Sequence, residues 1–160
     1  MDLTPKPADD SATEMVQVVL PNDANPLGFI LGGTVMHLID IAGAIACHRH
    51  TRTRLVTAAV DDLQFLHPIK VGDLIILRAR VTCVFTTSLE VLVDVMSEET
   101  LTGRRRQTSR AFLTFVAIDE NGDRLKIPPL LVETEEERRV CEEAHARRKQ
   151  RLLRRIMAEG

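Results

Sequence analysis

An apolar stretch between Thr34 and His50 constrains the fold of this chain more than any other feature. It contains no proline and one glycine, Gly43, and its residues are apolar on nearly every side of a helix. A helix of this composition has to be covered by the rest of the protein, because it offers no continuous polar face to water. The sequence therefore predicts a buried central helix.

The residues after Leu55 predict the layer that covers this helix. Apolar and polar side chains alternate there, as in strands with one covered face, and Asn121 with Gly122 is a dipeptide typical of hairpin turns. We therefore expect an α+β fold in which a long antiparallel sheet wraps around a buried central helix. In the first strand of the alternating region, the positions predicted to face the core are Ile75, Leu77, Ala79, Val81 and Cys83.

The two ends of the chain differ from this central part. Residues 1–13 are polar and contain two prolines, which predicts a flexible N-terminal lead before a first strand at about residues 14–20. The main domain is then expected over residues 14–132. Thr134 has the position of an N-cap, with a glutamate three residues later, and predicts a charged C-terminal helix over residues 133–160.

Basic residues gather in the last part of that helix. Their position suits the negative end of the helix dipole, so we interpret them as a solvated helix end. Contact with a phosphate-bearing ligand or a neighbouring subunit is the alternative. They are Arg147, Arg148, Lys149, Arg151, Arg154 and Arg155.

Composition excludes several classes of function. The 160 residues carry a formal net charge of -2 and include no Trp or Tyr, which argues against a nucleic-acid partner. No apolar run reaches the roughly 20 residues of a membrane span, and the acidic start does not resemble a signal peptide. We therefore expect a cytoplasmic protein with no membrane span.

The cysteines and histidines predict no metal site. Cys47, Cys83 and Cys141 are widely spaced and form no C-x-x-C pattern, which argues against both a disulfide framework and a zinc knuckle. We expect three reduced packing residues. His48 and His50 resemble a ligand pair, but no third and fourth ligand follow at a suitable spacing.

Asp40 is the clearest candidate for a functional side chain. It lies among the apolar residues of the predicted central helix, where a carboxylate is costly unless it is hydrogen-bonded or used. Met36 and Ala44 share its side of the helix, and Gly43 leaves room beside it for a substrate. The alternative is a core aspartate that caps or pairs with a local donor.

Three further residues near Asp40 are weaker candidates. Gly32 and Gly33 supply unhindered backbone N–H groups at the positive end of a helix, which can hold an oxyanion. Tight packing of loop and helix is the alternative explanation. Asn25 lies in a turn-rich loop, where asparagine is also common for conformational reasons.

Basic residues near the start of a later strand could meet a nucleotide phosphate or guard the end of a sheet. They are Arg104, Arg105, Arg106 and Arg110. The sequence lacks G-x-S-x-G, P-loop and dinucleotide-binding motifs, which removes the usual serine-hydrolase, nucleotidase and dehydrogenase interpretations. A single sheet around one helix also leaves open edges and a half-covered helix, which predicts a homodimer.

A series of motifs runs along most of the chain in a fixed order. They are Asn25-Pro26-Leu27-Gly28, residues 31–36 with Asp40, and residues 56–61, 67–73, 87–91, 111–117 and 128–130. Together they resemble the hotdog-fold acyl-CoA thioesterases, specifically the group of brain-type acyl-CoA hydrolases and their small bacterial single-domain relatives.

The resemblance implies a hotdog fold that hydrolyses acyl-CoA to a carboxylic acid and CoA without a further cofactor. It implies that Asp40 is the catalytic carboxylate, acting as general base or as nucleophile. Asn25 would face it from the partner subunit, and the thioester carbonyl would point at backbone N–H groups near Gly33, next to Gly32. The active site would then require a homodimer, and such dimers often assemble into a hexamer as a trimer of dimers.

The resemblance also implies where CoA lies. The pantetheine arm would run beside the strand after the central helix, at Thr57, Ala58 and Val60. Candidates for contact with the nucleotide end are Thr87, Ser88, Arg104, Arg106 and Arg110. Phe85 is a departure, since relatives often have glycine there.

Two other functions are alternatives. A non-catalytic acyl-CoA-binding or sensing module would use the same groove without turnover. A hotdog hydratase would need a histidine and an acid acting together, and His37 lies three residues before Asp40, a rotation of about 300° that leaves the two side chains about 60° apart around the helix.

Overall fold

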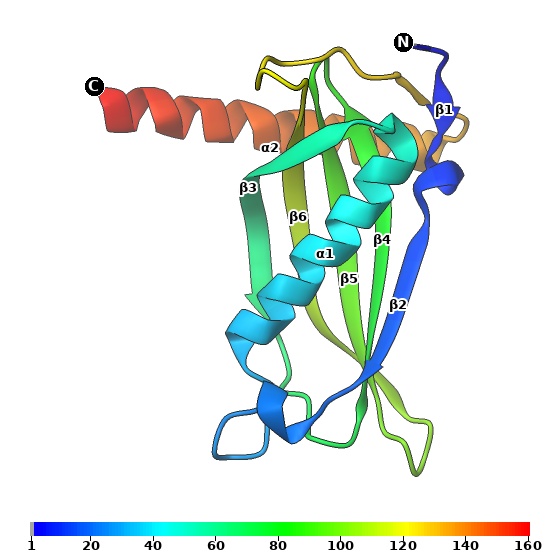
Figure 1. Cartoon of the computed structure of the whole chain (residues 1–160), viewed down its shortest axis with the longest axis vertical. Helices are drawn as coiled ribbons and strands as arrows, with labels where there is room; N and C mark the ends of the chain where they lie inside the picture. Colours follow the sequence, from blue (N-terminus) through cyan, green and yellow to red (C-terminus); the bar gives the residue numbers. More distant parts are fainter. Residues whose placement is uncertain (1) are drawn as a thin grey trace.

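The computed structural model describes residues 2–160, which form a five-stranded antiparallel sheet with a helix on each face (Figure 1). The 20-residue helix α1 (Gly32–Thr51) crosses one face, and α2 (Glu135–Glu159) crosses the other. This confirms the predicted α+β architecture. The strands, in their spatial order, are β2 (Thr13–Val18), β4 (Leu74–Val84), β5 (Ser88–Glu98), β6 (Arg105–Ile118) and β3 (Arg54–Phe65). Among the described residues, no helix is both long and apolar enough to cross a membrane.

The core lies between α1 and the sheet. Ile39 and Ala42 of α1 pack against strand residues such as Leu113, and all three are almost fully buried. Gly43 faces the sheet as well: a Cβ atom there would lie 3.1 Å from Val91 and 3.3 Å from Phe115. The expectation that Gly43 leaves room beside Asp40 is therefore wrong. Its missing side chain instead lets α1 approach β5 and β6 closely.

We predict that Gly43→Val destabilises the fold, because the added side chain has to push α1 away from Val91 and Phe115. Overpacking of this kind typically lowers the free energy of unfolding by about 1–3 kcal/mol. Urea unfolding followed by circular dichroism measures the change. Gly33→Ala is the matched control, since nothing lies within 4 Å of a Cβ at that position, and unfolding at the same urea concentration for both variants would contradict the prediction.

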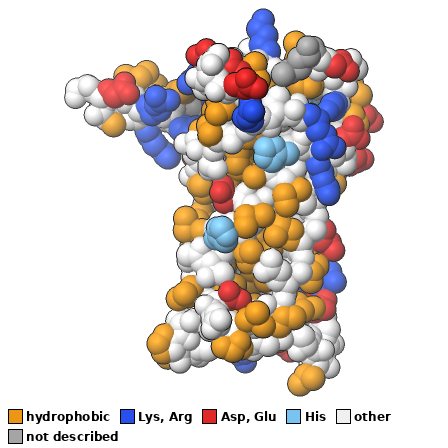
Figure 2. Space-filling model, in the orientation of Figure 1, with side chains coloured by type: hydrophobic (Ala, Val, Ile, Leu, Met, Phe, Trp, Pro, Cys, Tyr) orange, Lys and Arg blue, Asp and Glu red, His pale blue; other side chains and the backbone are white. Residues whose placement is uncertain are grey.

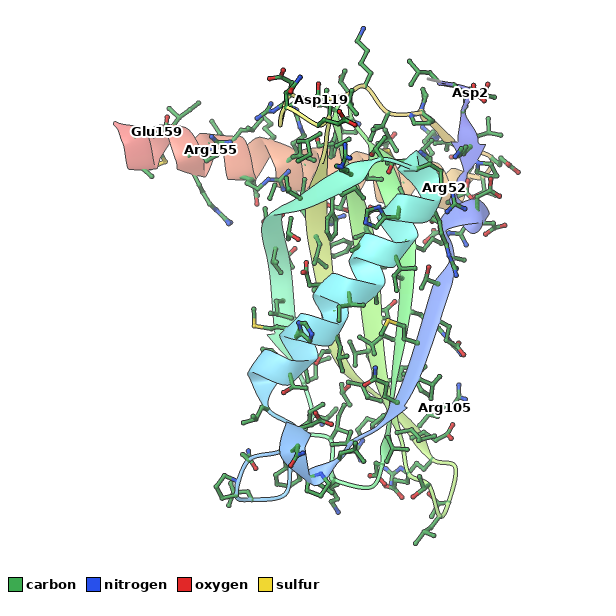
Figure 3. The ribbon with its side chains drawn as sticks, viewed as in Figure 1. Asp2, Arg52, Arg105, Asp119, Arg155 and Glu159 are labelled. Atoms are coloured by element: carbon green, nitrogen blue, oxygen red, sulfur yellow. A yellow bond between two sulfur atoms is a disulfide. The ribbon has the colours of Figure 1, made fainter. Side chains whose placement is uncertain are left out.

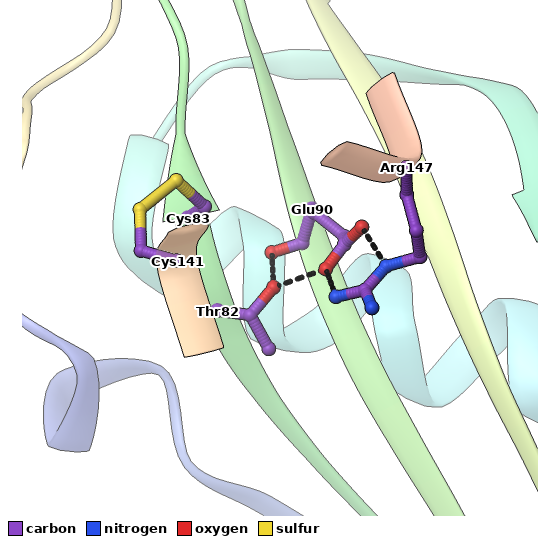
Figure 4. The surroundings of a disulfide bond; sticks show 5 residues. All are labelled: Thr82, Cys83, Glu90, Cys141 and Arg147. Carbon is purple, nitrogen blue, oxygen red and sulfur yellow. Dashed lines mark hydrogen bonds and ion pairs between the residues drawn. A yellow bond between two sulfur atoms is a disulfide. The ribbon is translucent and has the colours of Figure 1, made fainter. Parts of the chain in front are cut away.

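A β-bulge in β4 changes the direction of Cys83. The register passes from Val81 opposite Val91 to Cys83 opposite Glu90, so Thr82 is an extra residue. An extra residue of this kind reverses the alternation of side chains beyond it. Cys83 consequently faces α2 and forms a disulfide with Cys141 (Figure 4). The prediction of three reduced cysteines, and of Cys83 on the core face, is therefore wrong.

Cys47 is the one free cysteine among the described residues. It lies fully buried in the core on α1, and burial raises the pKa of its thiol far above the ordinary value. This thiol stays protonated at physiological pH. Cys47 is a packing residue, as predicted.

Helix α2 begins as the sequence indicates. The Thr134 hydroxyl accepts a hydrogen bond from the Glu137 backbone N–H at 3.1 Å, which confirms the predicted N-cap. The C-terminal end of the helix extends past the edge of the sheet, where Arg155 and Glu159 mark its projecting end (Figures 1 and 3).

The basic residues of α2 are only partly a solvated helix end. Arg147 donates two hydrogen bonds to the buried carboxylate of Glu90, at 2.9 and 2.8 Å. The Thr82 hydroxyl donates a third to the same carboxylate at 2.7 Å (Figure 4). Arg151 pairs with Asp61 of β3 at 2.7 Å. Each pair is largely buried, so removal of one partner would leave the other as an uncompensated buried charge.

Residues 6–11 pack against the rest of the chain, which corrects the prediction of a flexible lead over residues 1–13 for the part that the structure describes; residue 1 lies outside the described residues. Lys6–Pro7 (β1) pairs in parallel with Leu130–Leu131 (β7), and a short 3-10 helix, η1, spans Ala8–Ser11. The buried hydroxyl of Ser11 donates to the Ala8 carbonyl and accepts from the Val81 backbone N–H. These contacts tie the segment to β4. A second 3-10 helix, η2, spans Pro21–Asp23.

His50, near the end of α1, is fully buried. Its Nε2 lies 2.7 Å from the Pro128 carbonyl and donates to it, since a carbonyl can only accept. Its Nδ1 is buried with no partner among the described residues. Burial lowers the pKa of His50 below 6.5, helped by Lys6 and opposed by the Pro128 carbonyl and Asp10.

We therefore predict that the fold loses stability as the pH falls from 6.5 toward the lowered pKa of folded His50. In this range His50 is protonated in the unfolded chain but not in the folded chain. The free energy of unfolding therefore falls by at most about 1.4 kcal/mol per pH unit. His50→Gln removes this titration and should flatten the dependence of unfolding free energy on pH in that range. The exposed His48 supplies the control, His48→Gln; equal pH slopes for both variants would refute the assignment.

Candidate functional site

Asp40 lies midway along α1 and is half-buried. Its Oδ1 accepts a hydrogen bond from the Thr57 hydroxyl on β3 at 2.8 Å. This bond leaves the rest of the carboxylate free to act on another group, because an ionised carboxylate can accept several hydrogen bonds. Asp40 is thus a positioned but accessible carboxylate.

A second bulge explains why β3 presents this hydroxyl. Thr57 pairs with Phe115 and Val60 pairs with Leu113, with Ala58 as the extra residue between the two registers. Phe115 and Leu113 both belong to the core on the α1 side. Thr57 and Val60 therefore face α1, although they are three residues apart in a strand.

Apolar side chains surround this carboxylate but remain open to solvent. Met36, one turn before Asp40 on α1, is 45% exposed, and Val60, which faces α1 from β3, is 43% exposed. Hydrophobic side chains are visible over the middle of this face in Figure 2, whereas most lysines and arginines lie toward its upper end and right edge. In a single protomer, Asp40 therefore lies beside an apolar surface that is open to solvent.

Gly32 and Gly33 form the first turn of α1. The first backbone hydrogen bond within the helix runs from Val35 to Leu31, so the preceding N–H groups stay available for an external acceptor. Both glycines are exposed. Gly33 and Asp40 share one face of α1, and seven residues separate them by about 10 Å along the axis.

Asn25 lies in the loop before α1. Its Oδ1 accepts hydrogen bonds from the backbone N–H groups of Leu27 and Phe29, at 3.0 and 3.2 Å, while its side-chain NH2 remains available. It lines a cavity of about 360 Å³ that includes Gly32 and Phe65 but not Asp40. One protomer therefore brings Asn25 to the start of the helix and not to the carboxylate.

The residues predicted to contact the nucleotide end of CoA fall into separate groups. Thr87 ends the turn between β4 and β5 and Ser88 begins β5, and the carbonyls of both accept hydrogen bonds from backbone N–H groups. Arg104 and Arg106 line a cavity of about 550 Å³ together with Lys70. Ser88 pairs with Val116 of β6, which lies ten residues from Arg106 in the same strand. Ten strand residues correspond to about 33 Å, so the two groups are far apart. Arg105 and Asp119 mark the two ends of the sheet in Figure 3.

Arg110 belongs to neither group. It lies 3.6 Å from Asp94 and stacks over the ring of Phe112, which Arg147 of α2 covers from 3.6 Å. Arg110 is therefore part of the sheet face under α2. Lys70 joins the cavity of Arg104 and Arg106 without having been singled out in the sequence, because only folding brings its loop to that hairpin.

The chain matches proteins of known family across this fold and site. Residues 27–103 match the family model of the thioesterase superfamily. A Bacillus subtilis protein named as an uncharacterized acyl-CoA thioester hydrolase is 43% identical over 119 residues, which cover 74% of this chain and 69% of the relative. The human cytosolic acyl coenzyme A thioester hydrolase is 34% identical over 91% of this chain, which spans only 39% of that longer protein.

Solved structures agree with this assignment. An acyl-CoA hydrolase from Bacillus cereus has a TM-score of 0.91 at 31% identity, covering 98% of this chain and 95% of that one. A hexameric acyl-CoA thioesterase has a TM-score of 0.89 at 40% identity, covering 94% and 97%. The chain therefore belongs to the thioesterase superfamily, among the acyl-CoA hydrolases of the hotdog fold.

One further structure bears on the site. An acyl-CoA hydrolase of Staphylococcus aureus, with a TM-score of 0.87 at 32% identity over 96% of this chain and 94% of that one, was solved with butyryl coenzyme A and coenzyme A. It was also solved as three alanine variants, which replace an aspartate, an asparagine and a threonine.

Proposed function

We propose that this protein hydrolyses the thioester of acyl-CoA, releasing a carboxylic acid and CoA. The observation that carries the proposal is Asp40, an accessible carboxylate on an apolar helix face that Thr57 holds in place. The names of the relatives support the same reaction. An aspartate, an asparagine and a threonine, the residue types replaced in the Staphylococcus aureus enzyme, are also the types of Asp40, Asn25 and Thr57.

Asp40 acts as a general base in this proposal. A thioester carbonyl held about 3 Å from the Gly33 N–H lies several ångströms from a carboxylate that is about 10 Å further along the helix. That gap accommodates a water molecule and is long for direct attack by the carboxylate. Asp40 takes a proton from the water, whose oxygen bonds to the carbonyl carbon. The Gly33 N–H stabilises the oxyanion, and the C–S bond then breaks as the CoA sulfur takes up the proton that Asp40 accepted from the water.

A second copy of the chain completes the site. Strand β3 is an edge of the sheet with exposed apolar side chains at Val60 and Phe65, and Met36 of α1 is exposed as well. Pairing two such edges removes both from solvent. We propose that Asn25 of one protomer then faces Asp40 of the other, and that dimers associate further, as in the hexameric relative.

CoA is expected to follow this shared edge. The pantetheine arm passes Ala58 and Val60, because the Thr57 hydroxyl is engaged by Asp40. Arg104, Arg106 and Lys70 are the proposed contacts for phosphate groups, since they gather cationic side chains around one cavity. Thr87 and Ser88 are too distant to serve the same end of a ligand within one protomer. Arg110 is not retained, because it pairs with Asp94 on the other face.

We predict that Asp40→Asn lowers kcat by roughly 10²–10⁴-fold, the usual contribution of a general base, with little change in KM. Thiol release from acyl-CoAs of several chain lengths measures the effect. Asp123→Asn, an exposed aspartate in a distant turn, is the matched control and should keep the wild-type rate. Equal rates for Asp40→Asn and wild type would reject the role, and tight acyl-CoA binding without thiol release by the wild type would favour a binding module.

We also predict that mixed dimers of two inactive variants regain activity. Asn25→Asp keeps the oxygen that accepts from Leu27 and Phe29 but removes the NH2 group. Dimers of one Asn25→Asp chain and one Asp40→Asn chain contain one intact site if the two residues meet across the interface. Random co-refolding should then restore about one quarter of the wild-type rate. No recovery, with heterodimers verified by mass spectrometry, would place both residues in one subunit's site.

A further inference from the structure

Two cysteines and a histidine meet where α2 crosses β4, outside the proposed active site. The sulfur atoms of Cys83 and Cys141 and a ring nitrogen of His145 all lie within 4.8 Å of one another. Cys141 and His145 are four residues apart on α2 and therefore share one face of the helix. Cys83 joins them because the bulge at Thr82 turns it toward α2.

The surroundings leave these three side chains as a separate group. The buried carboxylate of Glu90, which pairs with Cys83 across β4 and β5, already has Arg147 and Thr82 as partners (Figure 4). The ring of Phe85 packs edge-on against His145 at 5.0 Å and limits where the imidazole can point. Burial decreases from Cys83, which is fully buried, through Cys141 to the exposed His145, so the group opens to solvent on the histidine side.

Reduction of the disulfide would convert this group into a set of metal ligands. Two thiolates and one imidazole are the donors that Zn²⁺ prefers, and Cys₂His sites with one open position are an established arrangement. The two thiolate charges also neutralise a divalent cation, which allows a partly buried site without an unpaired charge. The three donor atoms already lie within 4.8 Å of one another, so small side-chain movements could bring them to a common tetrahedral ion with Zn–S bonds of about 2.3 Å.

We propose that Cys83, Cys141 and His145 form a redox-gated site for a zinc-type divalent cation. Two molecules of an external thiol reduce the disulfide and leave as their own disulfide, which yields two cysteine thiols. The cation then displaces one proton from each thiol and takes a nitrogen of His145, with water as the fourth ligand. Helix α2 is joined to β4 covalently in the oxidised chain and through the metal in the reduced chain.

The test is a titration of the full-length chain with Co²⁺, which gives thiolate-to-metal absorption when it binds cysteine. The chain is reduced with a phosphine, desalted without oxygen and titrated, and Zn²⁺ is then added. We expect one Co²⁺ per chain, a charge-transfer band that Zn²⁺ abolishes, and no band in the oxidised chain. Absence of the band in the reduced wild type, or its presence in the oxidised chain, would overturn the proposal.

Two variants assign the ligands. Cys141→Ser removes one of the two thiolate ligands and should therefore weaken the charge-transfer band. His145→Ala should weaken Co²⁺ binding at least tenfold. His48→Ala, which removes another exposed histidine of a helix, is the matched control and should bind as the wild type does. An unchanged band in Cys141→Ser, or unchanged affinity in a His145→Ala chain with wild-type circular dichroism, would refute the three-ligand site.

Discussion

The rest of the structure depends on covering α1, a helix whose apolar residues occupy nearly every side. One sheet can cover only one side of it. Ile39 and Ala42 meet the sheet, and Gly43 allows the close approach, while Met36, one turn before Asp40, stays 45% exposed. Asp40 itself is half-buried. In the dimer that we propose, covering the remaining apolar surface brings the partner subunit to the carboxylate that we propose as the catalytic base.

Two single-residue bulges determine which side chains meet. The extra residue at Ala58 lets both Thr57 and Val60 face α1, and this places the hydroxyl against Asp40. The extra residue at Thr82 turns Cys83 from the core toward α2. Each bulge thus turns one strand side chain toward a helix, Thr57 toward α1 and Cys83 toward α2.

Helix α2 supports the strand that carries the proposed site. Arg147 and Glu90 fix it over the centre of the sheet, and Arg151 reaches Asp61 of β3, four residues beyond Thr57. The contact between Cys83 and Cys141 adds a third attachment at β4. A helix that composition alone describes as solvated is thereby coupled to the edge strand on which Asp40 depends.

The sequence by itself determined the central helix, the antiparallel strands, the N-cap at Thr134 and the choice of Asp40, because each follows from local periodicity or from a charge in an apolar run. It could not determine the partner of that charge or the state of Cys83. Both depend on bulges, which shift register by one residue and leave no clear mark in an alternating pattern. The separation of Arg110 from Arg104 and Arg106 likewise belongs to the tertiary structure. Residues close in sequence occupy different faces and ends of a sheet only after the strands have paired.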